Sequence, residues 1–123
     1  MFQEAFYEVL KHEGIVSITS WSKDNVHVAN TWNSYVQITT DHRILIPAAW
    51  FHKTQKNVDQ NNRVILTLGS REVQGKMGMG TGFVIDGTAK FLTSGHDFEQ
   101  MKEKFSFLTR VLEITPESVR QTI

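Results

Sequence analysis

The chain has 123 residues and a mass of 14.1 kDa, which is the size of one domain. Its 13 Lys and Arg balance 13 Asp and Glu, so it lacks the broad positive charge that a general nucleic-acid or anionic-membrane binder needs. Cysteine is absent, which excludes disulfides, thiolate metal sites and thiol nucleophiles. No apolar run is long enough for a membrane helix, and the N-terminus lacks the features of a signal peptide. We therefore expect a cytoplasmic, single-domain protein over residues 1–123, with no nucleic-acid partner and no membrane partner.

The first half of the chain opens with a predicted helix over about Gln3–Glu13 and a strand over Ile15–Trp21. A long strand over about Val26–Thr39 follows, with the clearest period of two in the sequence. Five apolar residues of this strand share one face: Val26, Val28, Trp32, Val36 and Ile38. A third strand covers Ile44 to about Trp50, and Pro47 within it favours an edge position or a bulge.

The second half is read in the same way. Its expected elements are a surface helix His52–Gln60, strands Arg63–Val73 and Thr81–Thr93 around a glycine-rich loop, a helix entered at Ser94, and a last strand Arg110–Thr115 ended by Pro116. This order lacks the strand–helix alternation of a doubly wound parallel sheet. It predicts a mainly β fold, a small barrel with peripheral helices.

Several common chemistries are excluded by spacing. The glycine loop, with Gly75, Gly78 and Gly80, does not match GxGxxG and leads into a strand, so it is read as a hairpin loop or a flexible ligand rim. The five histidines show no metal-ligand spacing. No nucleophile elbow or conspicuous carboxylate pair is present, so nothing in the sequence indicates a hydrolase.

The segment Asn30-Thr31-Trp32-Asn33 lies inside a predicted strand, where asparagine is depleted. Such a conflict with local preference often marks a site. The amides can pair with a planar heterocycle and Trp32 offers an aromatic surface. An equally weighted interpretation is that Asn30 and Asn33 sit at a bulge and satisfy backbone groups.

The segment His52-Lys53-Thr54 lies where a strand gives way to a helix. Free amides at a helix start, a lysine charge and a threonine hydroxyl suit a phosphate. An ordinary helix cap, with Thr54 at the N-cap and Lys53 in solvent, is the alternative. Taken together, the two segments indicate a phosphorylated aromatic cofactor.

These motifs, with FYEVLKHEG, NTWNSY, HKTQKNV, RVILTLGSREVQG and GTGF in order along the chain, resemble the FMN-binding proteins of the flavin split-barrel superfamily, which includes pyridoxamine 5′-phosphate oxidase. The small FMN-binding proteins of sulfate-reducing bacteria look most similar. The resemblance implies a six-stranded antiparallel Greek-key split β-barrel, a homodimer, and one FMN per subunit near the dimer interface.

The resemblance also implies site residues. Asn30, Thr31, Trp32 and Asn33 would line the ring and part of the phosphate tail, and Lys53 and Thr54 would hold the phosphate. Trp50, Phe51 and His52 would supply backbone around the ring, and Thr81 and Gly82 would close the site. The chain departs from the family where small residues often precede HKT, because it has Ala48-Ala49-Trp50-Phe51, and where close relatives have a tryptophan, because it has Phe107.

The resemblance implies an FMN flavoprotein that acts in electron transfer or as a flavin-dependent oxidoreductase, with a redox protein or a reduced nicotinamide as partner. No residue stands out as a catalytic acid or base, and no metal site is expected. An NAD(P)H:flavin reductase or a pyridoxamine-phosphate-type oxidase is one alternative. A non-redox module that stores FMN or binds haem is another, with His52 as the only histidine near the expected pocket.

Overall fold

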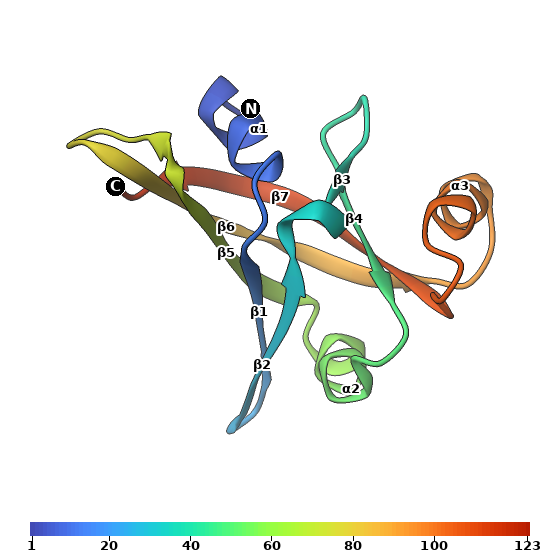
Figure 1. Ribbon diagram of the computed structural model, residues 1–123. Coiled ribbons are helices and arrows are strands. Elements are labelled where there is room, and N and C mark those ends of the chain that lie inside the picture. Colours follow the sequence, from blue (N-terminus) through green and yellow to red (C-terminus); the bar gives the residue numbers. More distant parts are fainter.

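The computed structural model describes all 123 residues as one antiparallel sheet with three α-helices (Figure 1). The sheet order is β2-β1-β5-β6-β7-β4-β3. The strands are β1 (Ile15–Ser22), β2 (Asn25–Trp32), β3 (Gln37–Ile38), β4 (Ile44–Ala48), β5 (Arg63–Gln74), β6 (Met79–Leu92) and β7 (Arg110–Gln121). The predicted mainly β class is confirmed, and β3, of two residues, makes the seventh strand where six were expected.

The sheet must roll up on itself. β2 and β3 stand at opposite ends of the sheet order, yet only residues 33–36 join them, and most of that link is a 3₁₀ turn, η1 (Asn33–Tyr35). Such a short link spans at most about 20 Å, so the two edges of the sheet lie near each other. No hydrogen-bonded pairing joins β2 to β3, so the barrel is split along this seam.

Two helices close the ends of the barrel. Phe6 and Val9 of α1 (Glu4–Leu10) are buried in a core cluster of 17 residues, and the Phe6 ring meets Phe83 of β6 edge-on at 5.5 Å between centroids. Val58 of α2 (His52–Gln60) enters the same cluster, and α1 and α2 lie at opposite ends of the sheet in Figure 1. No helix has both the length and the apolar composition to cross a membrane.

The third helix, α3 (His96–Lys104), packs outside the barrel on a separate cluster. Met101 and Leu108 belong to that cluster, and Phe98 and Phe105 pack against it, although the helix itself ends at Lys104. The residues after Lys104 continue in a turn towards β7, with Lys102 Nζ donating to the carbonyls of Ser106 at 2.9 Å and Leu108 at 2.7 Å. Lys102 therefore fixes the loop that carries Phe107.

The single strand predicted over Val26–Thr39 is wrong: β2 ends at Trp32, and β3 begins at Gln37. Asn33 breaks it, because its side chain turns inward and its backbone N–H bonds the Gly14 carbonyl at 2.9 Å. The alternation holds within β2, where Val26, Val28 and Trp32 share the outer, exposed face.

Two predicted strand ends were also wrong. Pro116 does not end the last strand; β7 continues to Gln121. The ladder shifts there, with Gly87 opposite Pro116 and Asp86 opposite Ser118, so Glu117 is an extra residue in a bulge that accommodates the missing proline N–H. The strand expected to reach Trp50 stops at Ala48, because the backbone turns into α2.

Candidate functional site

A largely apolar cavity of about 500 Å³ opens on the outside of the barrel where β2, the end of β4 and the loop before β7 meet. Its lining residues are Asn30, Thr31, Trp32, Tyr35, Pro47, Ala49, Trp50, Phe51 and Phe107. Five of these are predicted site residues, and they come from two segments about 20 positions apart: Asn30, Thr31, Trp32, Trp50 and Phe51. The cavity therefore brings the segment Asn30-Thr31-Trp32 together with Trp50 and Phe51, whereas His52, Lys53 and Thr54 follow Phe51 in the chain and do not line it.

Two tryptophans form open walls of this cavity. Trp32 lies on the outer face of β2 and is 45% exposed, and Trp50, after β4, is 75% exposed. Large aromatic side chains that are this exposed often mark a surface that a ligand or a partner covers. The cavity is thus suited to a flat apolar ligand.

Tyr35 and Phe107 complete the aromatic wall. Their ring centroids are 5.5 Å apart, and both rings also meet Phe105, at 5.3 Å for Tyr35 and 6.1 Å for Phe107. Tyr35 was not predicted from the sequence, although it is the last residue of the NTWNSY motif. Phe107, which stands where close relatives have a tryptophan, lines the cavity within the same chain.

The start of α2 adjoins the cavity through Phe51, which both lines the cavity and precedes the helix. Phe51 adopts a left-handed conformation, with φ 68° and ψ 30°, and no side chain caps the helix. The first backbone hydrogen bond of the helix runs from Gln55 N–H to the Phe51 carbonyl at 2.9 Å. The N–H groups of His52, Lys53 and Thr54 therefore have no helical acceptor, which makes this end attractive to an anion.

Thr54 corrects the helix-cap interpretation. It is the third residue of α2 rather than the N-cap, it is fully buried, and its Oγ1 has no hydrogen-bond partner. Buried hydroxyls are normally paired, so an orphaned one needs an explanation. His52 and Lys53 are exposed at the same helix start, so a positive charge and an unpaired hydroxyl accompany the free N–H groups.

Asn33 lies on the inner side of the barrel, away from the cavity. Its Nδ2 donates to the carbonyls of His12 at 3.0 Å and Gly69 at 3.2 Å, and reaches that of Val9 at 3.5 Å. The interpretation that an asparagine of this segment satisfies backbone groups therefore holds for Asn33. Asn30, two strand positions before the end of β2, points outward and lines the cavity.

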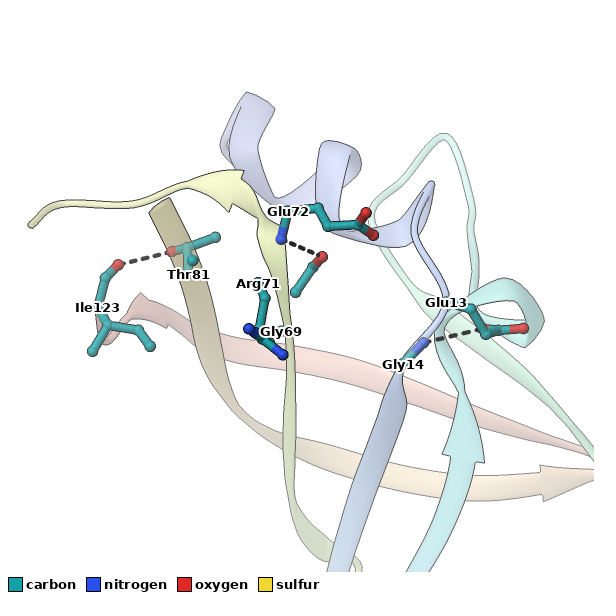
Figure 2. A pocket seen from close by; sticks show the side chains of 9 residues that line it. Glu13, Gly14, Gly69, Arg71, Glu72, Thr81 and Ile123 are labelled. Carbon is teal, nitrogen blue, oxygen red and sulfur yellow. Dashed lines mark hydrogen bonds between the residues drawn. The ribbon is translucent and has the colours of Figure 1, made fainter. Parts of the chain in front are cut away.

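Thr81 and Gly82 are not brought to this cavity. Thr81 lines a second, polar cavity of about 730 Å³ on the other side of β1, shown in Figure 2, with Gly14, Gly69 and Arg71 among its other lining residues. Thr81 Oγ1 donates to the Ile123 carbonyl at 2.8 Å, and the Gly82 carbonyl accepts from the Thr122 N–H at 2.9 Å. The two cavities share no lining residue.

Arg110, the first residue of β7, was not predicted from the sequence to lie near the site. It is 8% exposed, and its guanidinium donates to the carbonyls of Ala49 and Trp50 and to the side-chain oxygen of Gln55. Its Cζ lies 5.2 Å from the centroid of the Phe91 ring. No carboxylate lies within ion-pair distance, and burial lowers the pKa of Arg110 from its usual value.

A split barrel with an aromatic cavity beside an open helix start defines a small ligand-binding β-barrel protein. The family model described as pyridoxamine 5′-phosphate oxidase matches residues 2–123. The FMN-binding protein of Nitratidesulfovibrio vulgaris (strain DSM 19637 / Miyazaki F) is 45% identical over 123 residues, which is 100% of each chain. The chain belongs to the pyridoxamine 5′-phosphate oxidase family, as the sequence motifs indicated.

Solved structures agree on the fold. HupZ of Group A Streptococcus matches with a TM-score of 0.81 at 14% identity, over 98% of this chain and 94% of that one. An FMN-binding protein from Syntrophomonas wolfei subsp. wolfei matches with a TM-score of 0.76 at 13% identity, over 98% and 85%. At these identities the likeness shows the fold alone.

Proposed function

We propose that residues 1–123 form a single FMN-binding split-barrel domain that acts in electron transfer or as a flavin-dependent oxidoreductase. One observation carries the proposal: the aromatic cavity and the open start of α2 meet at Phe51, so a flat ring and an anionic tail could be held side by side. The full-length similarity to a protein named for FMN binding supports it.

The residues at the helix start fit a phosphate group. The free N–H groups of His52, Lys53 and Thr54 are donors, the Thr54 hydroxyl lacks a partner, and the Lys53 side chain is exposed and able to reach an anion. Thr31, which lines the cavity and is buried at the end of β2, would contact the tail between phosphate and ring.

The residues around the cavity fit the ring. Trp32, Trp50 and Tyr35 would cover its faces and exclude water, and Asn30 would offer an amide to its polar edge. FMN, when bound, would supply the redox chemistry, since a flavin accepts and gives up electrons where protein side chains do not. The protein would set the orientation and exposure of the ring.

The test compares FMN with riboflavin, which lacks the phosphate. We expect Lys53→Ala to weaken FMN binding about tenfold while riboflavin binding hardly changes, because a lysine contact to phosphate is charge-assisted. Flavin fluorescence titration measures both affinities. Lys56→Ala, an exposed lysine on the same helix, is the matched control and should leave both affinities unchanged. Equal losses for FMN and riboflavin in Lys53→Ala would refute the phosphate role.

We also propose that the protein forms a homodimer. The outer face of the β1–β2 hairpin carries exposed apolar side chains, including Ile15, Val26 and Val28, and runs on to Trp32 at the cavity. A second copy seated there would cover both the apolar face and the open side of the cavity. Thr81 and Gly82 would then contact the cofactor only from the second subunit.

The oligomeric state tests this interface. Val28→Lys places a charge in the centre of the face, so we expect sedimentation analysis to report a monomer for it and a dimer for the unmodified protein. Gln60→Lys, which adds the same charge at the exposed end of α2, should remain a dimer. A monomeric unmodified protein, or a dimeric Val28→Lys, would contradict the proposed face.

A turnover assay separates the carrier from the enzyme. Oxidation of a reduced nicotinamide by the FMN-loaded protein would favour a reductase, and its absence would favour a carrier served by another protein. A haem module is disfavoured by the lining of the cavity, because none of its nine residues is a histidine that could ligate the iron.

A further inference from the structure

The corner between β4 and α2 holds two backbone donors that no protein group uses. The N–H groups of Trp50 and Phe51 make no hydrogen bond to backbone or side-chain acceptors, although both residues line the aromatic cavity. An N–H group that stays unpaired beside a cavity is available to a ligand. The orientation of these two N–H groups depends on what holds their peptide planes.

Arg110 holds both planes from behind. Its guanidinium donates to the carbonyls of Ala49 and Trp50, the two carbonyls that belong to those planes. In a trans peptide the C=O and the following N–H point in opposite directions, so the N–H groups of Trp50 and Phe51 point away from Arg110. Arg110 itself does not line the cavity, whereas Ala49, Trp50 and Phe51 all do.

The corner is strained and needs such support. Phe51 adopts a left-handed conformation, which costs a non-glycine residue about 1–2 kcal/mol. Surrounding contacts must over-determine a residue held in this way. Arg110 supplies such contacts: its guanidinium donates to the Ala49 and Trp50 carbonyls and to the Gln55 side-chain oxygen, and it lies over the Phe91 ring.

The charge of Arg110 is also uncompensated. No carboxylate lies within 4.0 Å, and the side chain is largely buried, so its field is screened less than that of a surface arginine. A guanidinium stays protonated throughout the pH range in which proteins are folded. The corner therefore combines two outward N–H groups with a permanent positive charge behind them.

We propose that Arg110 is a positioning residue for the flavin ring: it aims the Trp50 and Phe51 N–H groups at the polar edge of the ring and stabilises the negative charge that this edge carries in the reduced state. The proposal rests on the proposed FMN function. It assigns to Arg110 a preference for reduced over oxidised flavin, a property that simple support of the fold would not create.

The experiment measures the midpoint potential of FMN bound to the unmodified protein, to Arg110→Met and to Arg110→Lys. We expect Arg110→Met to reduce the preference for reduced FMN about tenfold, which for a two-electron couple is a shift of about 30 mV to more negative potential. Arg110→Lys keeps the charge but loses the planar fork, so its potential should lie between the other two.

A second variant leaves Arg110 in place. Gln55→Glu puts a carboxylate against the guanidinium and compensates its charge, so the potential should fall in the same direction as in Arg110→Met. Gln60→Glu adds the same charge at the exposed end of α2 and should not change the potential. This pair remains informative if Arg110→Met fails to fold.

The outcomes separate the two proposals. An unchanged potential in Gln55→Glu, or in a folded and FMN-loaded Arg110→Met, would overturn the role of Arg110 and leave FMN binding standing. Failure of the unmodified protein to bind FMN would instead overturn the proposed function itself.

Discussion

At the scale of single residues, the polar side chains of the two predicted segments differ in what they bond. The Asn33 side chain donates to carbonyls of the α1–β1 connection and of β5, whereas the Asn30 side chain lines the cavity. Thr54 does neither: its hydroxyl is buried without a partner. Such a group costs stability in the free protein, and under the proposed function it would gain a partner only when FMN binds.

Thr54 therefore yields a prediction in which stability and affinity diverge. Thr54→Val removes the orphaned hydroxyl and keeps the shape of the side chain, so we expect the free energy of unfolding without FMN to stay the same or rise by up to about 1 kcal/mol. FMN affinity should fall about tenfold, because one charge-assisted hydrogen bond to the phosphate is lost. Urea unfolding of the apoprotein and an FMN titration measure the two effects. A large loss of stability together with unchanged FMN affinity would show that the hydroxyl serves the fold.

At the scale of elements, the bulge opposite Gly87 lets β7 continue past Pro116. A Cβ atom on Gly87 would lie 2.5 Å from the Thr115 carbonyl oxygen, closer than real contacts allow, and that atom belongs to backbone. We expect Gly87→Ala to lower the free energy of unfolding by about 2–3 kcal/mol, as overpacking does elsewhere. Gly82→Ala, whose nearest contacts would be 3.4 Å away, is the control in the same strand. Equal stability of the two variants in thermal unfolding would show that β6 and β7 can move apart at the bulge to accommodate the added methyl group.

The turn between β3 and β4 is tied to α3 and β7 by Arg43, which bonds Asp41 at 3.0 Å, Asp97 at 2.7 Å and Glu113 at 2.5 Å. The hydrogen bonds from Arg43, and then from Thr39, lower the pKa of Asp41 from its usual 3.8 to about 2. A lowered carboxyl pKa contributes stability that is present above pH 3.8 and is lost as the pH falls towards 2. We therefore expect this exposed group to contribute to a loss of stability in acid.

We expect the urea midpoint of the unmodified protein to fall between pH 4 and pH 2, and Arg43→Gln to show a smaller fall over the same interval, because the pKa of Asp41 then rises towards its usual value while the Thr39 hydrogen bond remains. Arg63→Gln removes a different arginine, one that pairs with Glu117 at 2.7 Å, and should keep the full acid dependence. An Arg43→Gln protein that loses as much stability as the unmodified one in acid would contradict this assignment.

At the scale of the whole molecule, the sequence predicted most of the fold because its hydrophobic periods are regular. The helix His52–Gln60 was predicted to the residue, and β1 and β5 to within one residue at each end. Its errors fall where tertiary contacts override local pattern. The predicted strand ends at Asn33 because its side chain turns inward and donates to three carbonyls that are distant in sequence. Pro116 is tolerated within β7 because Glu117 forms a bulge there.

The same contrast holds for the site. Trp32 was predicted from an unusual polar and aromatic segment within a strand, whereas Phe51 was named only through the family resemblance. Arg110 was not, because its role depends on β7 lying beside β4, and a strand pattern does not report which carbonyl a buried arginine meets. Thr81 was placed at the site by resemblance, yet within one chain it lines the other cavity. The sequence thus indicated the ligand chemistry better than it indicated the supporting contacts.

The central claim is that the β2 end and the α2 start form one site for FMN. Its most direct test is to purify the protein, release any chromophore by denaturation, and identify it by mass and absorption spectrum, with the apoprotein then titrated with FMN. We expect the chromophore to be FMN, bound at one per chain, and we expect the titration to restore a yellow protein. A different chromophore, or an apoprotein that stays colourless after excess FMN is removed, would contradict it.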